Sequence, residues 1–248
     1  MKHLISDADY DAITRSVAEG KLKHFALTAD GNGRWATTRG QQRSIGHEEG
    51  IHSFTTCLKA LCELKVSFFS IHAFSPENWG RDSAEVTYII DLVQRALTQM
   101  EPSFVRKQVR FLWAGSRNNL PASVIEFFKG LESRTAHHTG LTVQFCFNYG
   151  GRQEVYECRS QFNDESIDWN SPASRFGYHP HVPPVDFYVR TGGELRISNF
   201  LIWQLAHAEM YFTDVPWPAF REAELLQALA EFCKRHRSFG RLDPITTR

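Results

Sequence analysis

The sequence lacks what a disulfide scaffold, a membrane protein or a nucleic-acid-binding protein needs. Its 248 residues include five cysteines, an odd number without a C-x-x-C pair, so we expect a reduced cytoplasmic protein with buried thiols. Lys and Arg number 28, as do Asp and Glu, which leaves no net charge to attract nucleic acid or an anionic membrane. No stretch approaches the ~20 apolar residues of a membrane span. Any anion-binding site must therefore be local.

The usual nucleotide-binding motifs are also missing. The sequence has no G-x-x-x-x-G-K-[ST] loop. The segment GNGRWA, residues 31–36, approximates a dinucleotide fingerprint, but Ala36 is a weak substitute for its third glycine. The first nine residues contain no apolar run, so we expect no signal peptide.

Short apolar segments alternate with amphipathic ones along the chain. Strands are predicted at 25–29, 66–74, 109–114, 141–147, 186–190 and 210–212. Helices are predicted at 47–65, 86–97, from 121 to about 134, from about 151, from about 199 and at 222–237, with an irregular connection over 163–184. This order predicts a single α/β domain with a central, mostly parallel six-stranded sheet flanked by helices. We divide the chain into an N-terminal extension (1–20), this domain (21–240) and a C-terminal tail (241–248).

A polar cluster follows the first predicted strand, at the sheet edge where parallel α/β proteins bind ligands. Its sequence is DGNGRW, residues 30–35, and its glycines let backbone N–H groups approach an anion at a helix start. Arg39, Arg43 and His47 follow at intervals of four, which predicts one face of a helix. These cations suit a diphosphate, and we interpret Asp30 as a ligand of an intervening Mg²⁺. A solvated turn explains D-G-N-G alone equally well.

Further clusters follow the later strands. FSPENWGR, residues 74–81, combines a hydroxyl, a carboxylate, an amide and a guanidinium, and its tryptophan is unusual for a simple helix cap. RTGGELRIS, residues 190–198, predicts a second anion site. NYGGR, residues 148–152, is more typical of a tight helix entry. Glu209 offers a second carboxylate for a metal, although an ordinary ion-paired acid is the simpler interpretation.

These blocks resemble those of the cis-prenyltransferases, of which the undecaprenyl diphosphate synthases are the best-known bacterial members. The matching blocks run in order from about His24 to Gly240: DGNGRWA, RxxGH, FSxENWxR, NYGGR, RTGGExRISNF and WQxAxAExYFTD. The resemblance implies an α/β fold with a hydrophobic tunnel, a homodimer and Mg²⁺ dependence. It implies an enzyme that adds isopentenyl diphosphate to an allylic diphosphate, farnesyl or another length, with a Z double bond formed at each step. The product would draw this cytoplasmic enzyme towards a membrane surface.

The resemblance also assigns roles to individual residues. Asp30 would bind Mg²⁺ and assist departure of the diphosphate, and Glu209 matches a metal-associated acid. The residues holding the allylic diphosphate would be Gly31, Asn32, Gly33, Arg34, Arg43 and His47, with Arg39 nearby. Asn32 and Ser75 lie in the family's region of proton removal, where the base is not settled. The segment closing over isopentenyl diphosphate would contain Trp35, Glu77, Asn78, Trp79 and Arg81, and Glu77 is also a catalytic candidate. The matches to the isopentenyl diphosphate site are Arg190, Arg196 and Ser198.

The chain departs from the family pattern at a few positions. Leu195 replaces a histidine near the metal, Pro76 replaces a small polar residue, and no proline follows Arg81. The link from Asn148 to Asp186 is shorter than usual. Cys146 and Phe147 add bulk where long-tunnel relatives are small, although Ala73 is small as in long-chain enzymes. With no insertion over 86–100, these features predict a product of medium or short length.

Two alternatives share this fold. A non-catalytic partner subunit or lipid-diphosphate-binding protein would have lost the first-strand acid and the arginines, and this chain retains Asp30, Arg34 and Arg190. Irregular coupling or cyclising relatives lack S-x-E-N-W, which this chain keeps at 75–79. Both alternatives are therefore disfavoured.

Overall fold

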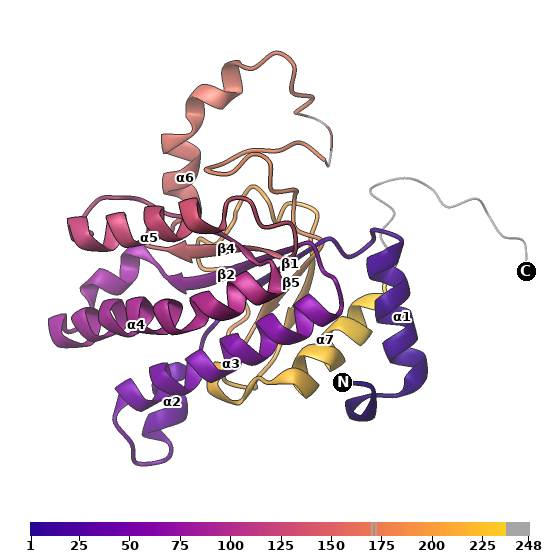
Figure 1. Cartoon of the computed structure of the whole chain (residues 1–248), viewed down its shortest axis with the longest axis horizontal. Coiled ribbons are helices and arrows are strands. Elements are labelled where there is room, and N and C mark those ends of the chain that lie inside the picture. The colour runs from indigo at the N-terminus through magenta and orange to yellow at the C-terminus, as the bar shows by residue number, and fades with distance from the viewer. Residues whose placement is uncertain (170, 172, 237–248) are drawn as a thin grey trace, which may run out of the picture.

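A computed structural model describes residues 1–169, 171 and 173–236, built around a parallel sheet (Figure 1). The strands are β1 (His24–Thr28), β2 (Phe68–Phe74), β3 (Arg110–Ala114), β4 (Thr142–Phe147), β5 (Phe187–Arg190) and β6 (Glu209–Phe212). Their order is β3-β4-β2-β1-β5-β6, and every neighbouring pair is parallel. The predicted six-stranded sheet is confirmed, and it is parallel throughout.

Helices lie in the connections between the strands up to β5, as is usual for parallel pairing, whereas turns connect β5 to β6. The α-helices of the described residues are α1 (Asp7–Ala18), α2 (Asn32–Thr37), α3 (Arg43–Glu63), α4 (Ser83–Lys107), α5 (Ala122–Thr135), α6 (Gly151–Glu157) and α7 (Glu222–Cys233). Short 3₁₀-helices are η1 (Lys2–Leu4), η2 (Pro76–Gly80), η3 (Arg159–Asn163) and η4 (Trp217–Ala219). The described part of the chain contains no helix long and apolar enough to cross a membrane.

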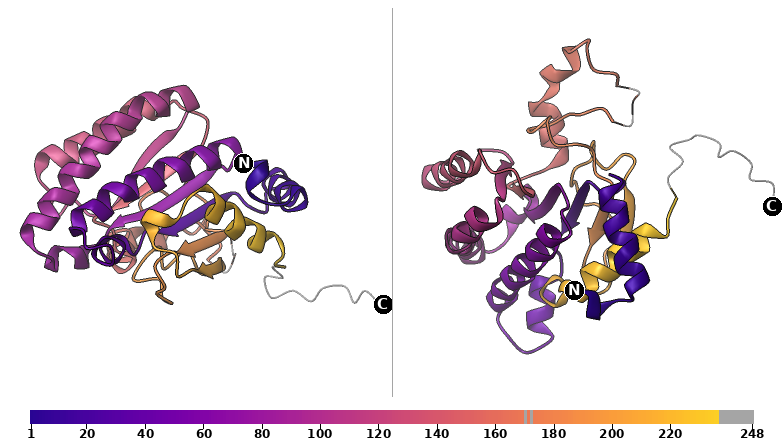
Figure 2. Two further views of the ribbon diagram at one scale, coloured as in Figure 1. Left: turned by 90° about the horizontal axis from the view of Figure 1, so that it is seen from below. Right: turned by 45° about the vertical axis from the view of Figure 1, so that its right-hand side comes forward.

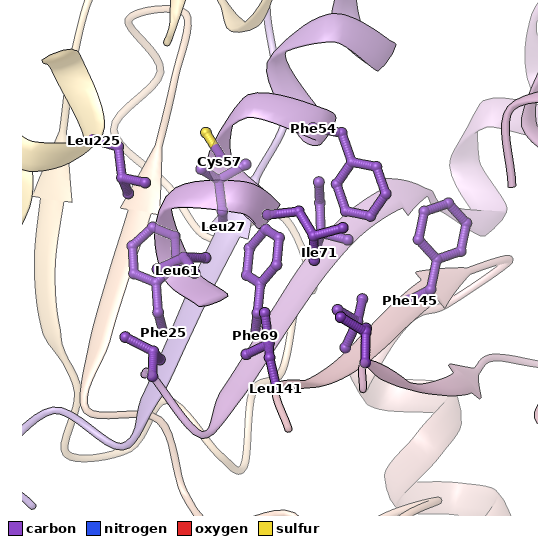
Figure 3. Packing of buried hydrophobic residues seen from close by; sticks show 14 of the residues in the cluster. Phe25, Leu27, Phe54, Cys57, Leu61, Phe69, Ile71, Leu141, Phe145 and Leu225 are labelled. Carbon is purple, nitrogen blue, oxygen red and sulfur yellow. The ribbon is translucent and has the colours of Figure 1, made fainter. Parts of the chain in front are cut away.

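The two faces of the sheet are covered differently. Helices α3, α4, α5 and α7 pack on one face, where the apolar stripe of α3 meets Phe25, Phe69 and Phe145 (Figure 3). Figure 2 (left) shows α3 and α4 running side by side across this face. The opposite face is covered by the turns around Phe200 and Leu205. The larger hydrophobic core therefore lies on the helical face.

Three predictions about helices are corrected. No helix begins at Asn199, because Ser198, Asn199 and Leu201 have φ angles of +47°, +60° and +40° and form turns. The expected single helix carrying the cations at 39–47 is interrupted, since α2 ends at Thr37 and α3 begins at Arg43. The last helix ends at Cys233, and residues 237–248 lie outside the described residues.

The predicted N-terminal extension contains an element that the sequence reading missed. Helix α1 begins after Ser6, whose hydroxyl accepts a hydrogen bond from the Asp9 amide at 3.1 Å. It lies beside α7 (Figure 1), and its Ile13 is completely buried. The segment is thus part of the packed structure.

The outer edge of β3 is covered by side chains. Glu132 and Thr135 of α5 accept hydrogen bonds from the amides of Trp113 and Phe111, at 2.8 and 3.0 Å. His138 Nδ1 donates a hydrogen bond to the Val109 carbonyl at 2.8 Å, and His179 Nε2 donates one to the Trp113 carbonyl at 2.9 Å. Four backbone groups along this edge, of a kind that is exposed in many sheets, are therefore paired within the chain.

Two buried histidines are held neutral by their surroundings. His24 donates from Nδ1 to the Pro183 carbonyl at 2.7 Å and accepts from the Ser70 hydroxyl at Nε2, also at 2.7 Å. His72 donates to the Tyr149 carbonyl at 3.1 Å and stacks on Phe200. Burial lowers the pKa of each from 6.5 to about 4, although these backbone hydrogen bonds oppose the shift. Protonation therefore favours the unfolded chain.

Stability should fall as the pH drops from 6.5 towards 4, because only the unfolded state binds these protons in that window. The loss is at most about 3 kcal/mol for each histidine. Urea unfolding at several pH values would measure it. His24→Gln should flatten the curve, whereas His52→Gln, which changes an exposed residue of α3, should not. An identical slope in both variants would contradict this account.

Candidate active site

A cavity of about 530 Å³ opens where β1, β2 and β5 end. These strands lie where the chain order changes direction in the sheet, the usual ligand position in open α/β folds. The cavity brings together most of the predicted site residues: Asp30, Gly31, Asn32, Gly33, Arg34, Arg43, His47, Ser75, Glu77, Asn78, Arg81, Arg190 and Ser198. It reaches inwards to Ala73, Phe74 and Ile89, so a polar mouth leads to an apolar end.

An ion pair joins the ends of β1 and β5 in this cavity. Asp30 Oδ2 accepts a hydrogen bond from Arg190 Nη2 at 2.8 Å, and Oδ1 accepts from the Gly31 amide at 2.6 Å. Arg34 Nη2 lies 3.3 Å from Oδ1. The Arg190 side chain is only 4% exposed, whereas that of Asp30 is 30% exposed. Asp30 therefore balances a buried charge while remaining open to the cavity.

Asp30 is ionised at neutral pH. Burial raises its pKa, but hydrogen bonds from Arg190 and the Gly31 amide, with the charges of Arg190 and Arg34, lower it by more. The net pKa lies below the ordinary value for aspartate. A permanent carboxylate at this position can bind a cation.

Glycines make room for the cations of the first cluster. Gly31 has a φ of +99°, and a side chain there would meet Pro216. A Cβ at Gly33 would lie 2.3 Å from Arg43 Nη1, so the guanidinium of Arg43 lies directly against this turn. The Gly-rich segment thus admits an arginine at close range.

The segment after β2 forms η2, whose residues point in different directions. The Ser75 amide donates to Asn78 Oδ1 at 3.0 Å, which closes the turn. Trp79 turns inwards, with Nε1 donating to Asn148 Oδ1 at 2.8 Å and its ring against Phe74. Glu77 is exposed beside the cavity and accepts from Asn199 Nδ2 at 3.3 Å. Trp79 thus anchors the turn, while Glu77 and Asn78 face the cavity.

The second anion cluster is only partly in the cavity. Arg190 Nη1 donates to Ser198 Oγ at 2.6 Å and to the Arg196 carbonyl at 2.5 Å. The side chain of Arg196 instead extends outwards to Glu194, at 2.5 Å. Leu195 is exposed beside it. Arg190 and Ser198 therefore line the cavity, and Arg196 lies at its margin.

Four other predicted residues lie outside the cavity lining: Trp35, Arg39, Trp79 and Glu209. Arg39 stacks on Trp35, 4.4 Å from the ring centre. Glu209 begins β6 opposite Phe187 and pairs with Arg235 at 3.1 Å, whereas Asp30 follows Thr28, which is opposite Arg190. Asp30 and Glu209, the two acids considered above for a metal, therefore lie at opposite ends of the parallel strands of this chain.

The sequence reading missed three residues at the site. Asn199 and His72 line the cavity, and Glu85 lies behind its cations. Asn199 accepts from the Arg152 amide at 2.9 Å as well as contacting Glu77, so it links α6 to η2. Asn199 could have been predicted from the sequence, because it follows Ser198 in the RTGGELRISNF block. Cys146 belongs to the opposite face of the sheet and is not beside Phe147 in the wall, because successive strand residues alternate.

The residues present fit a Mg²⁺ that is bound mainly through a substrate. Among the described residues, no three His, Cys, Asp or Glu side chains gather as a metal site. Mg²⁺ is commonly held by one or two carboxylates together with substrate phosphates and water. Asp30, ionised and open to the cavity between two groups of arginines, is the residue that suits this arrangement.

Comparison with known proteins agrees with this geometry. Residues 28–240 match the family described as "Putative undecaprenyl diphosphate synthase". An isoprenyl transferase of Treponema pallidum is 38% identical over 90% of this chain and all of its own length. A trans,polycis-polyprenyl diphosphate synthase of Thermobifida fusca, specific for (2Z,6E)-farnesyl diphosphate, is 37% identical over 90% of this chain and 82% of its own.

Solved structures give the same result. Lavandulyl diphosphate synthase from Lavandula x intermedia, in complex with dimethylallyl diphosphate, has a TM-score of 0.79 at 27% identity, over 90% of this chain and 99% of its own. A "probable undecaprenyl diphosphate synthase" from Campylobacter jejuni has a TM-score of 0.71 at 28% identity, over 88% and 98% of the two chains. The chain belongs to the undecaprenyl diphosphate synthase family of isoprenyl transferases.

Proposed function

We propose that this enzyme condenses isopentenyl diphosphate with an allylic diphosphate and forms a Z double bond at each addition. The observation that carries the proposal is one cavity in which an ionised Asp30 contacts Arg34 and Arg190, while Arg43 lies against the Gly31–Gly33 turn of the same cavity. Two groups of cations suit two diphosphates, and the apolar end at Ala73 and Ile89 suits a prenyl tail. The names of the related enzymes support the same reaction.

The reaction requires three bond changes. The allylic C–O bond breaks and the diphosphate leaves with the electron pair, while the isopentenyl double bond attacks the allylic carbon to form the new C–C bond. A proton is then lost from the former isopentenyl unit. Arg34, Arg43 and the Gly31–Gly33 turn would stabilise the charge that develops on the departing diphosphate, which is the dominant electrostatic effect in such catalysis. Arg190 and Ser198, with Arg196, would hold isopentenyl diphosphate.

Mg²⁺ held by Asp30 would supply Lewis-acid stabilisation to the diphosphate oxygens. Ser75 and Asn32 line the cavity beside the reacting groups and are our candidates for positioning the proton that is lost, and Glu77, Asn78 and Arg81 would close over isopentenyl diphosphate. Trp35, Trp79 and Arg39 would act from outside the cavity by supporting these segments. Glu209 would contact a metal only at a site that is formed between two subunits.

The proposals for assembly and location rest on the resemblance to the family. We propose a cytoplasmic homodimer whose lipid product draws it to a membrane surface. The proposed product is of medium or short length, because Phe147 is fully buried and stacks against Phe74, Phe128 and Phe145 on the helical face of the sheet. Close-packed aromatic side chains yield little to an incoming chain.

The central test is turnover with isopentenyl diphosphate, Mg²⁺ and primers of several lengths. Asp30→Asn should lower the rate by at least roughly 10²–10³, because the charge on the leaving diphosphate is then poorly stabilised. EDTA should abolish turnover and added Mg²⁺ should restore it. Asp91→Asn, on the exposed side of α4, is the matched control and should retain activity.

Full activity in EDTA would overturn the mechanism. Because Asp30 also balances the buried Arg190, unfolding of each variant should be measured alongside. Product formed from dimethylallyl diphosphate without isopentenyl diphosphate would indicate irregular coupling instead.

Substitutions in the two anion sites should raise the KM for different substrates. Arg43→Ala should mainly raise the KM for the allylic substrate, and Arg196→Ala that for isopentenyl diphosphate. Loss of a charge-assisted hydrogen bond costs ~1.5–3 kcal/mol, so each KM should rise roughly tenfold or more. Equal effects of both variants on both substrates would contradict separate sites.

Product length should respond to the cavity wall. Phe147 is outside the cavity lining but stacks on Phe74, which belongs to it, so Phe147→Leu should give Phe74 room to move back and lengthen the dominant product, as measured by mass spectrometry. Ala73→Leu, which fills the inner end of the cavity, should shorten it. Leucine is preferred to alanine at 147, because Phe→Ala in a core costs about 3–5 kcal/mol. An unchanged distribution in both variants would identify Phe147 as core packing alone.

A further inference from the structure

One carboxylate contacts three basic side chains at the mouth of the cavity, those of Arg43, His47 and Arg81. Glu85 Oε2 accepts from Arg43 Nε at 3.1 Å, and Oε1 accepts from Arg43 Nη2 at 3.2 Å. The same Oε1 accepts from His47 Nε2 at 3.2 Å and from Arg81 Nη1 at 3.3 Å. These cations come from α3 and from the segment after η2, so Glu85 joins two separate parts of the chain.

Glu85 lies behind the cations and not in the cavity. Arg43, His47 and Arg81 line the cavity, whereas Glu85 is outside its lining and its side chain is only 18% exposed. Its backbone is fixed in the first turn of α4, where Asp82 accepts from the Glu85 amide at 3.3 Å. A helix N-terminus favours a negative side chain. Glu85 is therefore placed to orient groups that a substrate meets, without meeting the substrate itself.

The contacts of Arg43 show what this orientation achieves. Glu85 occupies Nε and Nη2, while Nη1 is directed to the turn at Gly33, 2.3 Å from where a Cβ would stand. The Arg43 side chain is 47% exposed, so without its partner it could extend into solvent. A free arginine side chain loses much rotamer entropy when it binds a ligand, and pre-ordering removes that cost from binding.

In its neutral form, His47 is held by Glu85. Burial lowers the pKa of His47 below its ordinary value, although the hydrogen bond to Glu85 opposes this. At neutral pH the ring is therefore neutral and donates its Nε2 proton to Glu85. Arg43 and Arg81 are the charged members of the cluster.

We propose that Glu85 is a positioning residue that holds the Arg43 guanidinium against the Gly31–Gly33 turn, ready for the diphosphate of the allylic substrate. This inference rests on the proposed function, which assigns the allylic diphosphate to that turn. The opposite role is also testable: if Glu85 instead competed with the diphosphate for the cations, its removal would strengthen binding.

The test uses the full-length protein and two readouts. Binding of inorganic pyrophosphate with Mg²⁺ is measured by calorimetry, and KM and kcat are measured for each substrate. Glu85→Gln should weaken pyrophosphate binding and raise the allylic KM by roughly tenfold, with little change in kcat or in the KM for isopentenyl diphosphate. Glu85→Asp should restore part of the affinity. The control Asp91→Asn, which removes an exposed carboxylate of the same helix, should change neither readout.

A double variant shows whether Glu85 acts through Arg43. In an Arg43→Ala background, Glu85→Gln should have a smaller effect than it has alone, because the group that it orients is gone. Fully additive effects, unchanged binding or tighter binding in Glu85→Gln would overturn the inference. If Arg43→Ala weakens pyrophosphate binding and Glu85→Gln does not, only the role of Glu85 fails. If Arg43→Ala itself has no effect, the allylic-site assignment fails with it.

Discussion

The site depends on a single buried charge, the guanidinium of Arg190. It lies at the end of a central strand with 4% of its side chain exposed, where an uncompensated charge would be costly. Asp30, at the end of the adjacent strand, pairs with Arg190 Nη2. Arg190 Nη1 donates hydrogen bonds to the Ser198 hydroxyl and the Arg196 carbonyl. The left-handed backbone at Ser198 and Asn199 follows from the same demand, since it turns these groups back towards the sheet. One ion pair thus orders three loops around the cavity.

Charge is balanced within the site before any substrate binds. Asp30 faces Arg190 and Arg34, and Glu85 faces Arg43 and Arg81. The two carboxylates differ in access, because Asp30 lines the cavity and Glu85 does not. In the mechanism that we propose, a diphosphate enters a site whose cations are already ordered, and Asp30 and Glu85 divide the metal-binding and orienting roles between them.

The sequence predicted the sheet and most of the cavity, because both depend on local patterns. Apolar runs bounded by polar clusters identify parallel strands and their carboxyl ends, and these ends meet at one edge by geometry. Arg39 was misplaced because nothing in the spacing reveals the break between α2 and α3. The helix expected after Asn199 failed because Ser198 and Asn199, in left-handed backbone, bond to Arg190, Glu77 and the Arg152 amide, which are distant from the expected helix in sequence. Glu85 was missed for the same reason, since a lone glutamate after η2 gives no sign of its partners on α3.

The covered edge of β3 limits how copies of the chain can associate. The amides of Phe111 and Trp113 and the carbonyls of Val109 and Trp113 are already taken by α5, by His138 after it and by His179. A neighbouring molecule therefore finds no free strand there to extend, and intermolecular sheet growth across this edge would first require loss of those internal bonds. Subunits that meet on this side must do so through helix and loop side chains, which leaves the sheet of each subunit closed at β3.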